Sequence, residues 1–285
     1  IVFGDWSSDV CSSDLEAQVR SWHTRDYQAP VLTAAGLIAD ARRQDWHRME
    51  EMTEWLGKEP RDEMFAASLI RLWANSDDDR KWPALIAALA DSSPLVRSSA
   101  ARGLYGYLNA ESVTGLKPLL RDEYRLVRIQ AAAALARLPA EALTAGDSRA
   151  FEAAAEEYVE ALRTRGDQPD ALHDLGHFYL DRGEHGEAVR IFERSLRLRP
   201  DQLETLVSAA AAHYRSGRLD LAEAGLRRAL VVAPRNSAPR FNLAFLLEQQ
   251  ARVAEAEQAY RETLEIEPGH AGAARRLAEL QGRKE

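Results

Sequence analysis

The sequence predicts an all-α protein, an α-solenoid in which helix pairs of one kind are followed by helix pairs of another. In the C-terminal half, Pro200, Pro234 and Pro268 recur every 34 residues, and internal periods of this length are typical of stacked helical repeats. Nearer the middle of the chain, two segments share a second template with a shorter period. Apolar residues make up 46% of the 285 residues, enough to form a core, which argues against wholesale disorder.

Composition excludes several classes of partner and site. The chain has 37 Lys and Arg against 45 Asp and Glu, a formal net charge of −8, which argues against nucleic acid because phosphates require clustered cations. With one Cys, an internal disulfide and a cysteine-based zinc site are both excluded. No apolar run approaches the ~20 residues that span a bilayer.

The first fifteen residues are expected to be disordered and foreign to the fold. Residues 5–15 read DWSSDVCSSDL, a string that resembles a sequencing adapter translated in frame, and the alternative is a disordered N-terminal tail. We therefore exclude residues 1–15 from the fold. The native chain is then expected to begin near Glu16 as an N-terminally truncated fragment.

Residues 16–138 are predicted to form the first array of repeats. The segments 91–104 and 122–135 both begin with Asp and end in similar runs, LVRSSAARGL at 95–104 and LVRIQAAAAL at 126–135. The shared template is similar to HEAT repeats, in which an Asp caps the second helix of each pair and Val, Ala and Leu form its buried stripe. The expected helices are 32–42, 46–56, 63–74, 82–90, one within 91–104, 112–120 and one within 122–135.

Residues 139–149 are predicted to be a junction, and residues 150–285 a second array. The junction is short, so the two arrays are expected to touch as one continuous solenoid. The second array divides into a half repeat at 150–168, repeats at 169–202, 203–236 and 237–270, and a capping helix at 271–282.

Small and large residues recur in fixed columns of the second array. We number the positions of each 34-residue repeat from its first residue and call each position a column. Small residues at columns 8, 20 and 27 let neighbouring helices approach closely. Large residues at columns 7 and 24 fill the space between them. This pattern resembles the tetratricopeptide repeat, a helix–turn–helix of 34 residues. Gly183 and Gly217 fall at the turn inside each repeat, where the third repeat has Ala251. The columns are Leu175, Ala209 and Leu243; Gly176, Ala210 and Ala244; Ala188, Ala222 and Ala256; Phe192, Leu226 and Tyr260; Ser195, Ala229 and Thr263.

The tetratricopeptide resemblance implies a protein or peptide partner held in a concave groove lined by the first helix of each repeat. The aromatic residues among these positions suit the anchoring of a partner segment; the alternative is that Phe241 and Phe245 pack under the capping helix. The Lys and Asn residues with which chaperone-binding members hold a C-terminal carboxylate are missing. The predicted groove residues are His173, His177, Asp181, Val207, Ala211, Tyr214, Phe241, Phe245 and Glu248.

No catalytic motif, phosphate loop or haem-attachment motif occurs in the sequence, and we predict no enzyme activity. His173, His177 and Asp181 follow one another at i, i+4 and i+8, so they share a helix face. This spacing makes them a candidate metal site, but their register favours groove contacts, and we predict no metal.

The preferred function is therefore a non-enzymatic scaffold for protein–protein interaction. The order of a short helix with EAQVRSW, HEAT-like helices and tetratricopeptide repeats also resembles the C-terminal part of bacterial multihaem c-type cytochromes. That resemblance implies an extracytoplasmic electron-transfer protein whose haem c sites lie upstream of residue 16. No cofactor is predicted within the chain itself.

Overall fold

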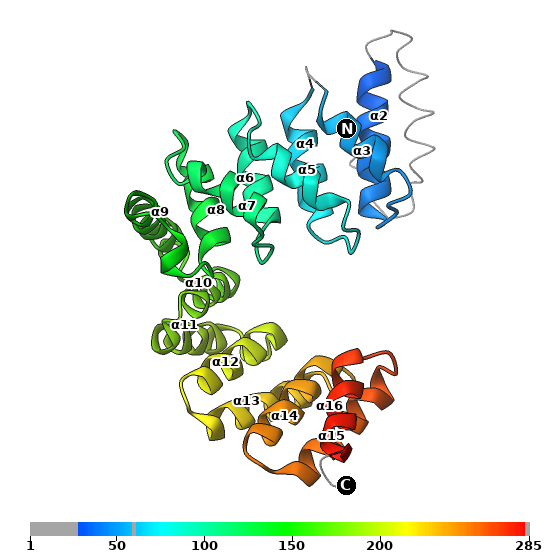
Figure 1. Cartoon of the computed structure of the whole chain (residues 1–285), viewed down its shortest axis with the longest axis vertical. Coiled ribbons are helices and arrows are strands. Elements are labelled where there is room, and N and C mark those ends of the chain that lie inside the picture. Colours follow the sequence, from blue (N-terminus) through cyan, green and yellow to red (C-terminus); the bar gives the residue numbers. More distant parts are fainter. Residues whose placement is uncertain (1–27, 59–60, 283–285) are drawn as a thin grey trace, which may run out of the picture. The chain divides into compact units, whose positions relative to one another are not determined.

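The computed structural model describes residues 28–58 and 61–282. These residues form the α-helices α2 to α16 and one 3₁₀ helix, and no strand occurs among them, which confirms the predicted all-α solenoid of helix pairs. The expectations for residues 1–15, and for the segment that contains EAQVRSW, lie outside the described residues. The chain divides into two compact units, Ile1–Tyr158 and Val159–Glu285 (Figure 1).

The first unit is a stack of helix pairs arranged in two layers. The second helices of successive pairs, α4, α6 and α8, pack directly on one another, while α5 packs on α6 and α7 on α8. The helices are α2 (Gln28–Arg42), α3 (Met49–Leu56), α4 (Glu63–Trp73), α5 (Lys81–Ala88), α6 (Pro94–Gly103), α7 (Ala110–Leu119) and α8 (Arg125–Leu135).

The predicted apolar stripe is the core of this unit. Val96 and Ala100 on α6, and Val127 and Ala131 on α8, are fully buried. Spaced four residues apart, these side chains share one helix face. In the preceding pair, Trp73 of α4 is also fully buried and donates its indole N–H to the sulfur of Met52 at 3.4 Å.

A ladder of Arg–carboxylate contacts joins successive pairs. Arg97 of α6 donates from Nε to Asp122 at 2.8 Å and from Nη2 to the same carboxylate at 3.0 Å. One period later, Arg128 binds Glu157 through Nε at 3.1 Å and Nη2 at 2.8 Å. One period earlier, Arg61 pairs with Asp91.

The prediction that the repeated Asp caps the second helix is therefore wrong. The N-cap residues of α6 and α8 are Ser93 and Tyr124, and neither cap makes a side-chain hydrogen bond to its helix. Asp91 and Asp122 instead accept the backbone N–H of those N-cap residues, at 2.8 and 2.9 Å. The same carboxylates also bind arginines: Asp91 pairs with Arg61 through its other oxygen, and both oxygens of Asp122 accept from Arg97. Such charge-assisted bonds are stronger than a bond from a neutral N–H.

The second unit is built of tetratricopeptide-type pairs, with α10 packed on α11, α12 on α13 and α14 on α15. The 3₁₀ helix Ala140–Ala142 and the start of α9 fall within the stretch predicted as a junction, and the division between the two units falls inside α9. Helix α9 (Ala145–Arg163) spans the division. The helices that lie wholly in the second unit are α10 (Pro169–Asp181), α11 (His185–Leu198), α12 (Leu203–Arg215), α13 (Leu219–Val232), α14 (Ser237–Gln249), α15 (Val253–Ile266) and α16 (Ala271–Gly282).

The predicted columns set how closely these helices approach. Ala188, Ala222 and Ala256 are fully buried. At column 8, a Cβ added to Gly176 would lie 2.5 Å from a ring carbon of Phe192, so α10 and α11 approach to a distance that only glycine permits. The small residues are therefore confirmed as contact points between helices.

The turns inside the repeats require the left-handed backbone region. Gly183 and Gly217 have φ of 76° and 75°, and Ala251 takes φ of 58° at the corresponding turn. Left-handed geometry is disfavoured for a residue with a Cβ, so the third repeat has the same turn at a cost in stability. No helix in the described part of the chain is long and apolar enough to cross a membrane.

Candidate partner-binding face

Three helices of the second unit carry the predicted groove residues, and we call this surface the α10–α14 face. Helix α10 supplies His173, His177 and Asp181, α12 supplies Val207, Ala211 and Tyr214, and α14 supplies Phe241, Phe245 and Glu248. Side-chain contacts link α10 to α12 and α12 to α14. The nine residues differ in how much of each remains available to a partner.

The two histidines are tied to hydroxyl groups of the next first helix. Nδ1 of His173 lies 2.9 Å from the hydroxyl of Thr205, and Nε2 of His177 lies 2.8 Å from that of Ser208. The two imidazoles are 4.6 Å apart, edge to face, and both contact the ring of Phe192. Their contacts therefore position α10 against α12.

Burial also decides the protonation of His173. Desolvation lowers the pKa of His173, and the nearby carboxylates of Asp174, Glu204 and Asp170 oppose the shift by raising it. The imidazole is consequently neutral near pH 7. A neutral imidazole can form its hydrogen bond with the Thr205 hydroxyl, and it places no positive charge next to the ring of Phe192.

The candidate metal ligands of α10 are not gathered into a cluster. In the described ranges, no group of three or more His, Cys, Asp or Glu side chains is placed to hold a metal ion. The i, i+4, i+8 spacing puts His173, His177 and Asp181 on one face of α10, but each imidazole directs one nitrogen to a hydroxyl of α12.

The α14 end of the face is closed by α16. The ring of Phe241 lies 5.8 Å from that of Tyr260 and 4.6 Å from that of His270, and it contacts the site of Gly272 at the start of α16. The Glu248 side chain, only 8% exposed, accepts from the Tyr260 hydroxyl at 2.8 Å and lies 3.5 Å from Nη1 of Arg276. These contacts correspond to the alternative in which the aromatic end packs under the capping helix.

The centre of the face is open and apolar. Ala211 is exposed, and Val207 and Tyr214 are half-buried on the same side of α12. The ring of Phe245 packs edge to face on Tyr214 at 6.0 Å, and the guanidinium of Arg276 lies 5.5 Å from the Phe245 ring. Tyr214 and Phe245 are thus half-buried and in contact with each other, and Ala211 lies three residues before Tyr214 on α12.

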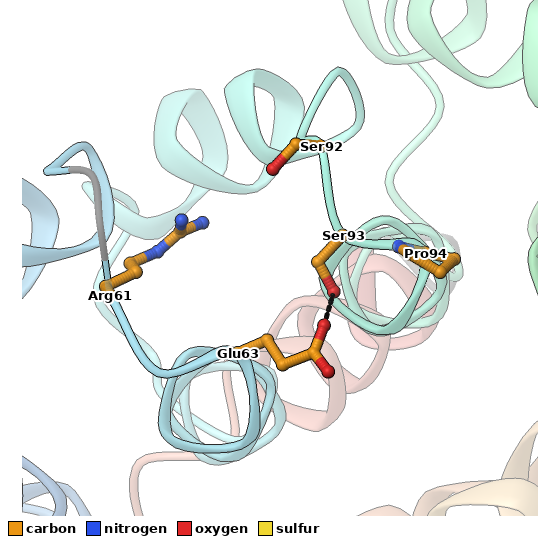
Figure 2. Close-up of a pocket in the computed structure, with 5 residues that line it drawn as sticks. All are labelled: Arg61, Glu63, Ser92, Ser93 and Pro94. Atoms are coloured by element: carbon orange, nitrogen blue, oxygen red, sulfur yellow. Dashed lines mark hydrogen bonds between the residues drawn. The ribbon is translucent and has the colours of Figure 1, made fainter.

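A pocket that the sequence did not reveal lies in the first unit, between the starts of α4 and α6 (Figure 2). It has a volume of ≈ 310 Å³ and is lined by Arg61, Glu63, Ser92, Ser93 and Pro94. Ser93 donates its hydroxyl to Glu63 at 2.5 Å, and Arg61 pairs with Asp91. The 31-residue period aligns Ser93, the N-cap of α6, with Asp62, the N-cap of α4 and the residue before Glu63, which was the available signal.

The fold defines the protein as a helical repeat protein, because successive pairs of antiparallel helices contact their neighbours along the chain. The chain belongs to the HEAT-repeat family: the family model, described as HEAT repeats, matches residues 49–136 and 82–197, together just over half of the chain. The second match continues through α9 into α11, where the tetratricopeptide columns begin. None of the curated proteins compared with this sequence matches it.

Part of the chain is similar to several solved repeat domains. The first tetratricopeptide domain of human RPAP3 is 19% identical, with a TM-score of 0.39 over 41% of this chain and 92% of that one. The Sgt2 tetratricopeptide domain from Aspergillus fumigatus is 25% identical, with a TM-score of 0.39 over 40% and 78%. The Yersinia enterocolitica secretion chaperone SycD, solved with a peptide of the translocator YopD, is 20% identical, with a TM-score of 0.39 over 41% and 94%.

Proposed function

We propose that this chain is a non-enzymatic scaffold that holds a segment of a partner protein on the α10–α14 face. The observation that carries the proposal is the exposed apolar centre of that face. Val207, Ala211 and Tyr214 follow at i, i+4 and i+7 along α12, so one side of the helix presents them together. Apolar residues on a solvent-facing surface, together with aromatic rings that pack on each other, suit the anchor side chains of a bound segment.

The choice of residues for a test follows from which side chains are free of the fold. Phe241 and Glu248 contact Tyr260 and the capping helix, so truncating them would disturb the fold as well as any binding. Ala211 is exposed in the middle of α12, and Ala224 is exposed in the middle of α13. Each position accepts a long side chain without filling the core.

The experiment selects a displayed library of random short peptides on the full chain and measures how tightly the enriched peptides bind. Ala211→Arg should weaken those peptides at least tenfold, about 1.4 kcal/mol or more, because a long cation would cover the apolar centre. The matched variant Ala224→Arg should bind as the parent does. Both variants should unfold at the parent's urea midpoint. Enrichment of no peptide, or equal binding by both variants, contradicts the proposed function.

The resemblance to multihaem cytochromes implies haem c sites upstream of residue 16, and this implication stays a prediction. The intact upstream reading frame tests it directly, because a cytochrome would carry CxxCH haem-attachment motifs there.

A further inference from the structure

The charges of the α10–α14 face are unevenly distributed. Three carboxylates act on His173, those of Asp174, Glu204 and Asp170. Asp170 accepts hydrogen bonds from Arg199 at 3.0 Å and Gln202 at 2.9 Å. Glu204 is exposed on the first turn of α12, and no salt bridge in the described part of the chain engages it. Glu204 therefore presents a negative charge to solvent at the start of α12.

Helix α12 carries charges of opposite sign at the two ends of its apolar strip. Glu204, Val207, Ala211 and Arg215 follow at i, i+3, i+7 and i+11, which places them on one side of the helix. Arg215 is exposed at the last turn. At 1.5 Å per residue, Glu204 and Arg215 are about 16 Å apart along the helix axis, with Val207 and Ala211 between them.

Resting on the proposed function, we infer that the bound segment is a short peptide with a basic residue at one end of an apolar centre and an acidic residue at the other. Its Lys or Arg lies at Glu204. Its apolar side chain lies over Ala211 against Tyr214 and Phe245, and its acidic side chain lies at Arg215. An extended chain rises about 3.3 Å per residue, so about five residues cover this span. Charge complementarity of this kind fixes the direction in which a segment binds.

The inference predicts the composition and the salt dependence of the peptides selected on the full chain. Enriched sequences should carry Lys or Arg on one side of an apolar residue. Their affinity should fall as salt rises from about 0.01 M to about 1 M, because the screening length shortens from about 30 Å to about 3 Å.

A charge-reversal variant tests whether Glu204 binds the basic residue of the peptide. Glu204→Lys should weaken the selected peptide about tenfold at low salt, and a peptide with Glu in place of its basic residue should bind this variant better than it binds the parent. Glu265→Lys makes the same charge change at an exposed position of α15, outside the face, and should leave binding unchanged.

The outcomes separate this inference from the function on which it rests. If the enriched peptides are acidic or uncharged at that end, or if Glu204→Lys weakens them no more than Glu265→Lys, the inferred partner chemistry is wrong. The proposed function then still stands, provided Ala211→Arg weakens binding at least tenfold. If Ala211→Arg has no effect, both fail. If the parent sediments as a dimer that Ala211→Arg dissociates, the occupant is a second copy of the chain and the inferred partner is overturned.

Discussion

At the scale of single residues, backbone geometry at three equivalent turns separates the third repeat from the first two. Gly183 and Gly217 adopt left-handed φ angles without a steric cost, while Ala251 adopts φ of 58° with a Cβ. Ala251 is exposed, so its methyl group contributes little packing to offset that cost.

We therefore predict that Ala251→Gly stabilises the protein by about 0.5–1 kcal/mol, because removal of the Cβ relieves the left-handed strain by more than the added freedom of the unfolded chain costs. The reciprocal change, Gly217→Ala, should destabilise by about 1 kcal/mol. Urea unfolding followed by circular dichroism measures both. Equal midpoints for the two variants and the parent would refute this account of the turns.

At the scale of helices, buried ion pairs connect one repeat to the next in the first unit. Arg97 is 14% exposed and Asp122 8% exposed, and Nη1 of Arg97 also donates to the backbone oxygen of Asp91 at 2.8 Å. Burial raises the pKa of Asp122, but the hydrogen bonds from Arg97 and the Tyr124 backbone outweigh it, so the pKa lies below its ordinary value. The carboxylate stays ionised, and it depends on its arginine.

Arg97→Met should destabilise the protein by about 3–5 kcal/mol, because it leaves a buried carboxylate without its partner. The double variant Arg97→Met with Asp122→Asn should recover part of that loss, since the charge itself is then gone. Arg71→Met, at an exposed position of α4, is the matched control and should stay within about 0.5 kcal/mol of the parent. A loss for Arg97→Met no larger than for the control would show that the ladder contributes little.

At the scale of the whole molecule, buried histidines link stability to pH. Burial lowers the pKa of His173, and burial together with the positive charge of Arg218 lowers that of His213 against the opposing carboxylate of Glu193. The unfolded chain, with an ordinary histidine pKa of about 6.5, binds protons at a higher pH than the folded chain. The stability that comes from keeping these two histidines neutral is therefore fully present above about pH 6.5, and it is lost as the pH decreases below that value.

The urea concentration at the unfolding midpoint should accordingly decrease when the pH is lowered from 7.5 to 5.5, two values on either side of the ordinary histidine pKa of about 6.5. His173→Gln with His213→Gln should reduce that fall, because glutamine cannot take up a proton. His185→Gln, on α11, is the control. A midpoint that does not change with pH in the parent, or changes as much in the double variant, would contradict the linkage.

The sequence by itself determined the all-α class, the two helical periods and the small residues at the helix contacts, because each depends on spacing along the chain. Gly176 and Ala222 could be assigned to interfaces from their columns alone. The role of each residue on the α10–α14 face depended on neighbours that are distant in sequence. Glu248 was predicted as a groove residue, yet its carboxylate is held by Tyr260 and Arg276.

The same limit applies to the caps and the histidines. Asp91 was expected to be an N-cap, but α6 begins at Pro94 with Ser93 as its N-cap, and Asp91 instead accepts the Ser93 N–H and pairs with Arg61, thirty residues earlier. His173 and His177 have the spacing of metal ligands, but Thr205 and Ser208 on the next repeat engage their nitrogens. Periodicity reports which side of a helix is buried, whereas the partner of a polar side chain is decided by the free energy of contacts that exist only after the helices have packed. That is why only the tertiary structure shows which of the nine predicted groove residues already have partners within the fold and that Ala211 is exposed.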